Sequence, residues 1–217
     1  MKIKIFFACI LATFFFTCQQ AGNQEQTNNT NQEQSNKSSG TTENNATDIN
    51  ELILNKGMEI TGQLQQLLAS NLQQAIADSG VSHALQFCSL QAYPFTDSVA
   101  ELNGVKIKRA SSKARNMKNR PEFDEFKIIA NYREAMAEGS SPEPIVEESE
   151  QLFSYYAPIM MFAPLCLKCH GILETDIAPQ DFIVINMIYP QDQATGFSLN
   201  ELRGIWRVDF DKSQFAF

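Results

Sequence analysis

The sequence predicts an α+β domain in which helices flank a central antiparallel sheet and a long helix comes first. Apolar residues recur at helical spacing over 49–76, and residues 105–111 alternate in the manner of a strand. Helical and strand-like segments do not alternate strictly along the rest of the chain. Strict alternation would indicate a parallel sheet, so an antiparallel sheet fits this order better.

The N-terminus has the features of an export signal. Lys2 and Lys4 precede an apolar run that ends at Phe16, and the run is short for a permanent membrane span. Cys18 lies where bacterial lipoproteins carry their lipidated cysteine. We therefore expect residues 1–17 to be a lipoprotein-type signal peptide, with ordinary secretion as the alternative.

A polar segment follows the signal. Of the 29 residues in 19–47, 21 are Gln, Asn, Ser or Thr and none is aromatic, so the segment lacks the residues of a core. A flexible coil of this length spans about 30 Å. We expect 18–47 to be a disordered tether that holds a domain of residues 48–217 at a membrane.

Two helices are expected at the start of the domain. Asp48 begins a capping-box pattern, and the long helix that follows should end at Gly80. Ser82 can cap a second, shorter helix that carries Cys88 and stops at Pro94.

A strand and a third helix come next. The alternation at 105–111 predicts the strand, and Pro121 opens a helix that Gly139 closes. Phe123 and Phe126 belong to the predicted apolar face of this helix.

The remaining elements complete the sheet. Residues 145–149 and 151–162 are expected to form a strand pair, 179–188 a helix, 191–196 a turn and 205–210 a closing strand. Four aromatic residues are expected in the core: Phe153, Tyr155, Phe162 and Trp206.

The segment PLCLKCHG, residues 164–171, holds the sequence pattern of covalent haem attachment. In C-x-x-C-H, the two cysteines bind the haem vinyl groups and the histidine becomes an axial ligand of the iron. Cys166, Cys169 and His170 fit these roles. A zinc site that also uses Cys88 and a redox disulfide are the alternatives, but the order of residues favours haem c.

The second axial ligand of such a haem stays open from the residues alone. Cys88, His83 and a methionine such as Met160 or Met161 are candidates, as is the absence of a protein ligand. Cys88 and His83 lie about 140° apart around a helix, so both cannot readily serve one iron.

Several runs resemble the bacterial haem-c PAS-like domain family, in the order that the family has them. They are ALQFCSLQA (84–92), IKRASSKARNMKNRPEFDEF (107–126), YYAPI (155–159), CLKCHG (166–171), YPQDQATGF (189–197) and LRGIWRV (202–208). The resemblance implies a PAS-like antiparallel sheet with flanking helices and one covalent haem. It also implies that His170 and Cys88 ligate the iron from opposite sides.

Seven basic residues and no acidic residue lie between Lys106 and Arg120. Because arginine binds carboxylates in a fork, Arg109, Lys113 and Arg115 are candidates to hold the haem propionates. A solvated basic face is the alternative interpretation. The chain as a whole is acidic: without Lys2 and Lys4 it has 15 basic and 25 acidic residues, a formal charge of −10, which makes nucleic acid an unsuitable partner.

We therefore expect an extracytoplasmic, membrane-anchored lipoprotein with a single haem c. It would sense redox state or a diatomic gas such as carbon monoxide or nitric oxide, and act through a signalling or redox partner. A small electron carrier is the alternative, followed by a zinc-binding lipoprotein. An enzyme such as a peroxidase is not expected, because two protein ligands leave no place for peroxide.

Overall fold

The computed structural model describes residues 40–215, with side chains from Ile49 onward. The predicted signal peptide 1–17, Cys18 and most of the predicted tether lie outside these residues. The elements in chain order are α1 (Gly40–Asn103), β1 (Lys106–Ala110), η1 (Met117–Asn119), α2 (Phe123–Ala137), β2 (Ile145–Glu148), β3 (Leu152–Met160), α3 (Pro164–His170), α4 (Pro179–Ile188), β4 (Leu202–Asp211) and η2 (Lys212–Phe215).

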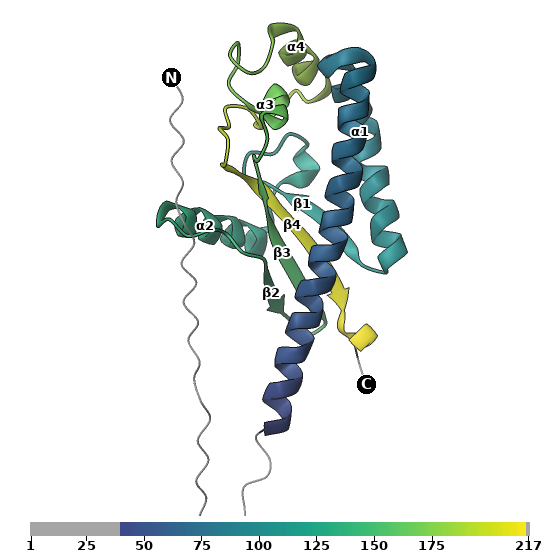
Figure 1. Cartoon of the computed structure of the whole chain (residues 1–217), viewed down its shortest axis with the longest axis vertical. Helices are drawn as coiled ribbons and strands as arrows, with labels where there is room; N and C mark the ends of the chain where they lie inside the picture. Colours follow the sequence, from purple (N-terminus) through teal and green to yellow (C-terminus); the bar gives the residue numbers. More distant parts are fainter. Residues whose placement is uncertain (1–39, 216–217) are drawn as a thin grey trace, which may run out of the picture. The chain divides into compact units, whose positions relative to one another are not determined.

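Helix α1 consists of two limbs that are separated by a break at Ser79 and Gly80. Gly80 has φ of 81°, a left-handed conformation that favours glycine, and the helix is interrupted there as predicted. We call residues 40–78 the first limb and 81–103 the second limb. Figure 1 shows the second limb running back beside the first.

Three predicted features of these helices are wrong in detail. The first limb begins at Gly40, so Asp48 lies inside the helix and does not start it. The second limb continues through Pro94 to Asn103. A proline removes one backbone donor, so the helix continues here without the hydrogen bond from position 94 to the Leu90 carbonyl. Ser82 was expected to cap the second helix, but its hydroxyl instead donates a hydrogen bond to Asp181 of α4, 2.5 Å away.

The four strands form one antiparallel sheet in the order β1-β4-β3-β2. Every predicted strand is present. The longest pairing joins β3 and β4, from Leu152 opposite Asp211 to Met160 opposite Leu202, with an irregularity after Ile159. The central position of β4 explains its almost continuous run of buried residues.

The first limb of α1 packs on one face of the sheet. The cluster between them consists of Ile53, Ile60, Leu64, Phe153, Tyr155, Ala157, Trp206, Val208, Phe210 and Phe215. Gly57 permits the close approach, because a Cβ atom there would lie 2.3 Å from the Tyr155 ring. Three of the four aromatic residues predicted for the core are therefore buried, whereas Phe162 is 61% exposed.

Helix α2 lies on the opposite face of the sheet (Figure 1) and contacts it through Ile128, Ile129 and Tyr132. The predicted apolar face was partly wrong, since Phe123 is 74% exposed and Phe126 is 54% exposed. The buried face is shifted to positions at spacing i, i+3, i+4 and i+7, and begins with Glu125.

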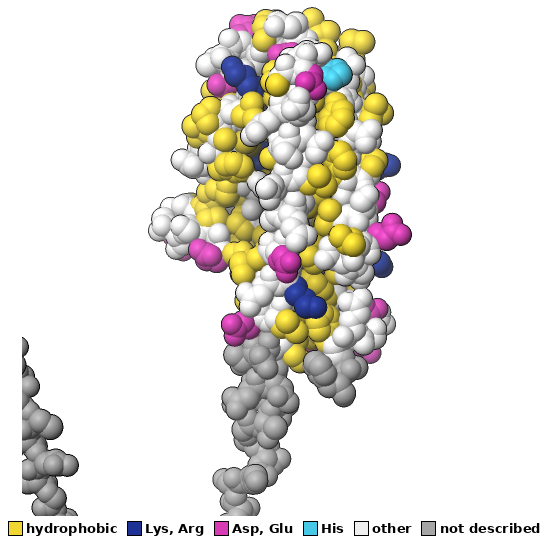
Figure 2. Space-filling view, turned by 45° about the vertical axis from the view of Figure 1, so that its right-hand side comes forward, with side chains coloured by type: hydrophobic (Ala, Val, Ile, Leu, Met, Phe, Trp, Pro, Cys, Tyr) yellow, Lys and Arg dark blue, Asp and Glu magenta, His cyan; other side chains and the backbone are white. Residues whose placement is uncertain are grey.

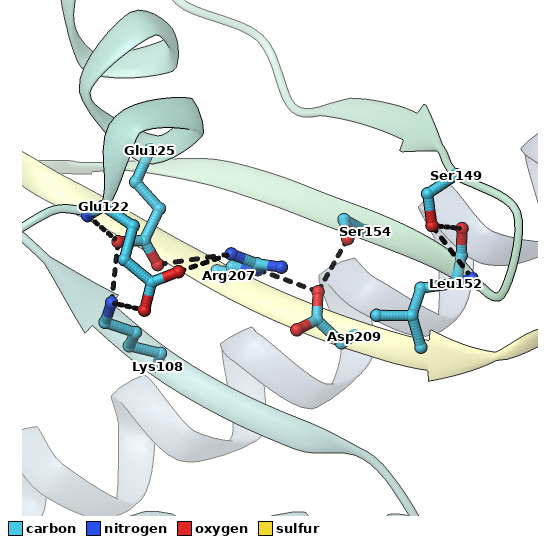
Figure 3. A network of polar contacts seen from close by, with 8 residues as sticks. All are labelled: Lys108, Glu122, Glu125, Ser149, Leu152, Ser154, Arg207 and Asp209. Atoms are coloured by element: carbon cyan, nitrogen blue, oxygen red, sulfur yellow. Dashed lines mark hydrogen bonds and ion pairs between the residues drawn. The ribbon is translucent and has the colours of Figure 1, made fainter.

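A network of charged residues holds the start of α2 against the sheet (Figure 3). The Glu125 carboxylate is fully buried and accepts hydrogen bonds from Lys108 Nζ at 2.7 Å and from the Glu122 backbone at 2.8 Å. Arg207 lies 3.7 Å from the other oxygen of Glu125 and also pairs with Asp209 at 2.8 Å. Two cations from β1 and β4 therefore balance this buried acid.

The exposed face of α1 is polar. In Figure 2, a strip of polar side chains and backbone runs along it, and hydrophobic side chains lie on both sides. Within residues 40–215, no helix combines the length and apolar character that a membrane crossing needs.

Candidate functional site

A cavity of about 340 Å³ lies between the two limbs of α1, the ends of β1 and β4, and helix α3. Its volume falls within the range of small-molecule and cofactor sites, and most of its lining is apolar. Six of the seven residues predicted for the haem site line it: Cys88, Arg109, Arg115, Cys166, Cys169 and His170.

Helix α3 carries the two cysteines of the motif. Pro164 occupies its first turn, and the three-residue spacing of Cys166 and Cys169 places both on one side of the helix. Cys169 is 8% exposed, and burial raises the pKa of its thiol to about 11. Both thiols are free, and both line the cavity.

His170 ends α3 and is held by the segment 194–197. Its Nδ1 lies 2.7 Å from the Ala194 carbonyl, and its own carbonyl accepts a hydrogen bond of 2.9 Å from the Phe197 backbone. With Nδ1 as the donor, Nε2 keeps its lone pair for another partner. Burial, together with Arg203 and Arg115 nearby, holds the pKa of His170 well below its ordinary value.

An ion pair between Arg115 and Asp192 holds this arrangement in place. Asp192 Oδ1 lies 3.0 Å from Arg115 Nε and accepts a hydrogen bond of 3.1 Å from the Ala194 backbone. Arg115 Nη2 donates to the Cys169 carbonyl at 2.5 Å. The ion pair therefore connects the end of α3 to the segment whose carbonyl orients His170.

Cys88 lines the cavity from the second limb of α1. Burial raises the pKa of its thiol, an effect that the nearby Arg109 partly opposes. Met160 and Met161 also line the cavity, whereas His83 is exposed and is not among the lining residues. The structure thus places Cys88 and the two methionines, but not His83, beside the C-x-x-C-H motif.

The basic residues predicted from the sequence separate into different environments. Arg109 and Arg115 line the cavity, whereas Lys113 does not, and its Nζ lies 4.2 Å from the centroid of the Phe197 ring. A further cation, Arg203 of β4, lines the cavity and was not predicted.

Sequence reasoning missed the roles of three features: Arg203, Asp192 and the backbone of 194–197. A signal for them exists, because they lie in the runs 189–197 and 202–208 that carry the family resemblance. We expected 191–196 only to be a turn. Its function as the support of His170 depends on backbone carbonyl and amide groups, which no side-chain pattern encodes.

The two alternatives to haem differ in what they require of these residues. Zinc would need Cys88, Cys166, Cys169 and His170 around one point, yet within the described part of the chain no three His, Cys, Asp or Glu side chains are grouped closely enough to hold a metal ion. A redox disulfide would join Cys166 and Cys169, which the structure holds as free thiols three residues apart on α3.

Comparisons with known proteins agree with the geometry of the fold. A family model described as Tll0287-like matches residues 24–210. Among solved structures, the cyanobacterial haem protein Tll0287 is similar, with a TM-score of 0.56 and 21% identity over 73% of this chain and 94% of that one. No curated protein matches the chain. The predicted α+β fold with an antiparallel sheet and a long first helix is confirmed.

Proposed function

Because this chain belongs to the Tll0287-like family, we propose that its cavity binds one haem, attached covalently through Cys166 and Cys169. The observation that carries the proposal is the meeting of a C-x-x-C-H motif and a third cysteine, Cys88, at one largely apolar cavity. The similar cyanobacterial structure is that of a haem protein, which supports haem as the ligand of this cavity.

The residues around the cavity fit this cofactor. Cys166 and Cys169 offer two free thiols with the spacing that thioether attachment needs. His170 offers Nε2, because the Ala194 carbonyl holds Nδ1. Cys88 offers a sulfur ligand from a separate element, as the family resemblance implies, and the apolar lining suits the porphyrin.

A haem bound here would supply a one-electron redox centre and, if one protein ligand were exchangeable, a position for a diatomic gas. His170 is fixed by hydrogen bonds to a neighbouring segment, whereas Cys88 lies on the second limb of α1, which follows the break at Gly80. We therefore assign the constant ligand to His170 and the exchangeable ligand to Cys88. This asymmetry favours a sensor of redox state or of a gas such as carbon monoxide or nitric oxide.

An electron carrier is the second candidate function. It would use the same cofactor and the same residues, but Cys88 would keep its place on reduction. The apolar residues Phe162 and Met187 are largely exposed near the elements that form the site, a feature that electron exchange with a partner protein could use.

The proposed location follows from the N-terminal sequence. Residues 1–17 would direct export, Cys18 would carry lipid, and the polar segment after it would hold the domain at an extracytoplasmic membrane surface. Output would then pass to a signalling or redox protein of the same compartment.

Absorption spectra of the purified protein, matured in a host that attaches haem c, test the ligand assignment. We expect Cys88→Ala to change the ferric spectrum and to increase the fraction of ferrous protein that binds carbon monoxide at a given gas concentration. His83→Ala is the matched control, because His83 is exposed on the same limb, and its spectra should equal those of the wild type.

An unchanged ferric spectrum in Cys88→Ala would remove Cys88 from the iron. Wild-type protein that keeps the same ligands in both oxidation states and binds no gas would favour the electron carrier over the sensor.

A further inference from the structure

Three guanidinium groups, those of Arg109, Arg115 and Arg203, meet at the cavity, and no acidic residue is among its lining residues. Arg115 is neutralised by Asp192, 3.0 Å away. The charges of Arg109 and Arg203 lack such a partner within the described residues. The cavity of an acidic protein therefore carries two positive charges that have no ion-pair partner among the described residues.

Arg203 is fixed in place by neutral acceptors. Its Nη1 donates to Ser111 Oγ at 2.6 Å and to the Lys113 carbonyl at 2.9 Å, and its guanidinium lies 5.2 Å from the centroid of the Phe197 ring. Arginine has five N–H donors in a rigid fork. In the described part of the chain, Nε and Nη2 of Arg203 have no acceptor, so one side of the fork is available to a ligand.

The side chain of Arg109 makes no hydrogen bond or ion pair with any residue that the structure describes, and its guanidinium lies 5.7 Å from the centroid of the Trp206 ring. It projects from β1, next to β4, which carries Arg203. Burial lowers the pKa of both side chains. For Arg203, burial and the nearby Arg115 and Arg109 together lower the pKa to about 10, an effect that Asp192 partly opposes. Both groups are therefore held in an environment that disfavours their charge.

Burying unpaired cations costs free energy unless an anion compensates them. Arginine forks match carboxylates, with two parallel hydrogen bonds from one guanidinium to one carboxylate. Two such groups in one cavity fit a ligand with two carboxylates, and haem has two propionates.

We propose that Arg109 and Arg203 bind the two carboxylates of the porphyrin. This inference rests on the proposed function. Arg115 acts differently, as a positioning residue for the end of α3, because Asp192 and the Cys169 carbonyl already engage it. Lys113, predicted from the charge pattern, contributes only its backbone carbonyl to the site, as an acceptor for Arg203.

Resonance Raman spectroscopy of the matured holoprotein tests the pair, because the propionate bending bands change with hydrogen bonding to the carboxylates. We expect these bands to shift in Arg109→Gln and in Arg203→Gln, and to shift most in the double variant. Lys106→Gln is the matched control, since Lys106 is an exposed cation on the same strand as Arg109, and it should leave the bands unchanged.

The haem content of denatured protein is measured on the same samples. Variants that carry covalent haem and show wild-type propionate bands would overturn the proposal and leave the proposed function intact. Wild-type protein without covalent haem would overturn both. If the glutamine variants do not accumulate, Arg109→Lys and Arg203→Lys keep the charge but lose the fork, and unshifted bands in these variants would also contradict the proposal.

Adding inorganic phosphate tests whether Arg109 and Arg203 bind the porphyrin carboxylates or a free anion from solution. We expect phosphate to leave the melting temperature of the holoprotein unchanged, because the two arginines are already paired. A rise in melting temperature that disappears in Arg203→Gln would show that the pair binds a free anion, and would overturn the proposal.

Discussion

Asp192 positions other residues of the site although it does not line the cavity itself. Its side chain is 2% exposed, binds Arg115 and fixes the backbone of Ala194, whose carbonyl orients His170. Removing one partner of a buried ion pair leaves the other charge without compensation, and this is far more costly than loss of an exposed pair.

We therefore predict that Asp192→Asn lowers the free energy of unfolding by about 3 kcal/mol, measured by chemical denaturation. The control is Glu148→Gln, which removes the exposed pair between Glu148 and Lys212 and should cost less than about 1 kcal/mol. Equal effects of the two substitutions would mean that the Arg115–Asp192 pair does not support the structure.

The basic residues show why a site is harder to predict than its motif. Arg109 and Arg115 were selected by charge and sequence position, and they do line the cavity, but Lys113 lies between them and does not. The chain from Ser111 to Asn119 forms a loop that ends in η1 and is closed by a hydrogen bond from the Ser111 backbone N–H to the Asn119 carbonyl. Side-chain direction in such a loop depends on its path, which charge spacing does not specify.

At the scale of elements, the contact between α1 and the sheet depends on the absence of a side chain at Gly57. A Cβ atom there would lie within 2.3 Å of the buried Tyr155 ring, whereas a Cβ atom at Gly62 on the same limb would meet nothing within 4 Å. An alanine at position 57 would gain helix propensity but clash with Tyr155, whereas an alanine at position 62 would gain helix propensity without a clash.

We predict that Gly57→Ala lowers the free energy of unfolding by about 1–3 kcal/mol, because overpacking forces Tyr155 or the helix to move. Gly62→Ala should raise it by up to about 1 kcal/mol, because alanine favours the helix. Thermal or chemical unfolding measures both. A stabilising Gly57→Ala would contradict the observed approach of the helix to the sheet.

Most elements were predictable from periodicity, and the errors have physical causes. The alternation of 105–111 and the apolar run of 205–210 predicted β1 and β4, and the glycine at position 80 predicted the break in α1. Pro94 was expected to end its helix, but packing of the second limb outweighs the loss of one hydrogen bond. The buried face of α2 was misassigned because Glu125 occupies a core position.

At the scale of the whole molecule, fold and family were predictable because the motif and the surrounding runs appear in order. The family model matches residues 24–210, and the predicted family is confirmed. Arg203 could not be assigned a role from the sequence, because its function depends on which cavity-lining cations lack an ion-pair partner in the folded chain. Asp192 could not be assigned one either, because its function depends on its contacts with Arg115 and with the backbone of Ala194.

The attachment of the chain to a membrane is a prediction about its N-terminal sequence. In a bacterial host that processes lipoproteins, the wild-type chain should fractionate with membranes and be released by detergent, whereas Cys18→Ser should be found in the soluble extracytoplasmic fraction. Cys9→Ser, within the signal itself, is the control and should behave as the wild type. A Cys18→Ser chain that stays with the membranes would argue against lipidation.

Every role proposed for these residues depends on one haem bound covalently at Cys166 and Cys169. The mass of the denatured mature protein, produced in a host that attaches haem c, measures this attachment. We expect a wild-type mass that exceeds the mass of the polypeptide by one haem, and no such increase in the Cys166→Ala, Cys169→Ala double variant. A wild-type chain with the mass of the bare polypeptide would contradict this expectation.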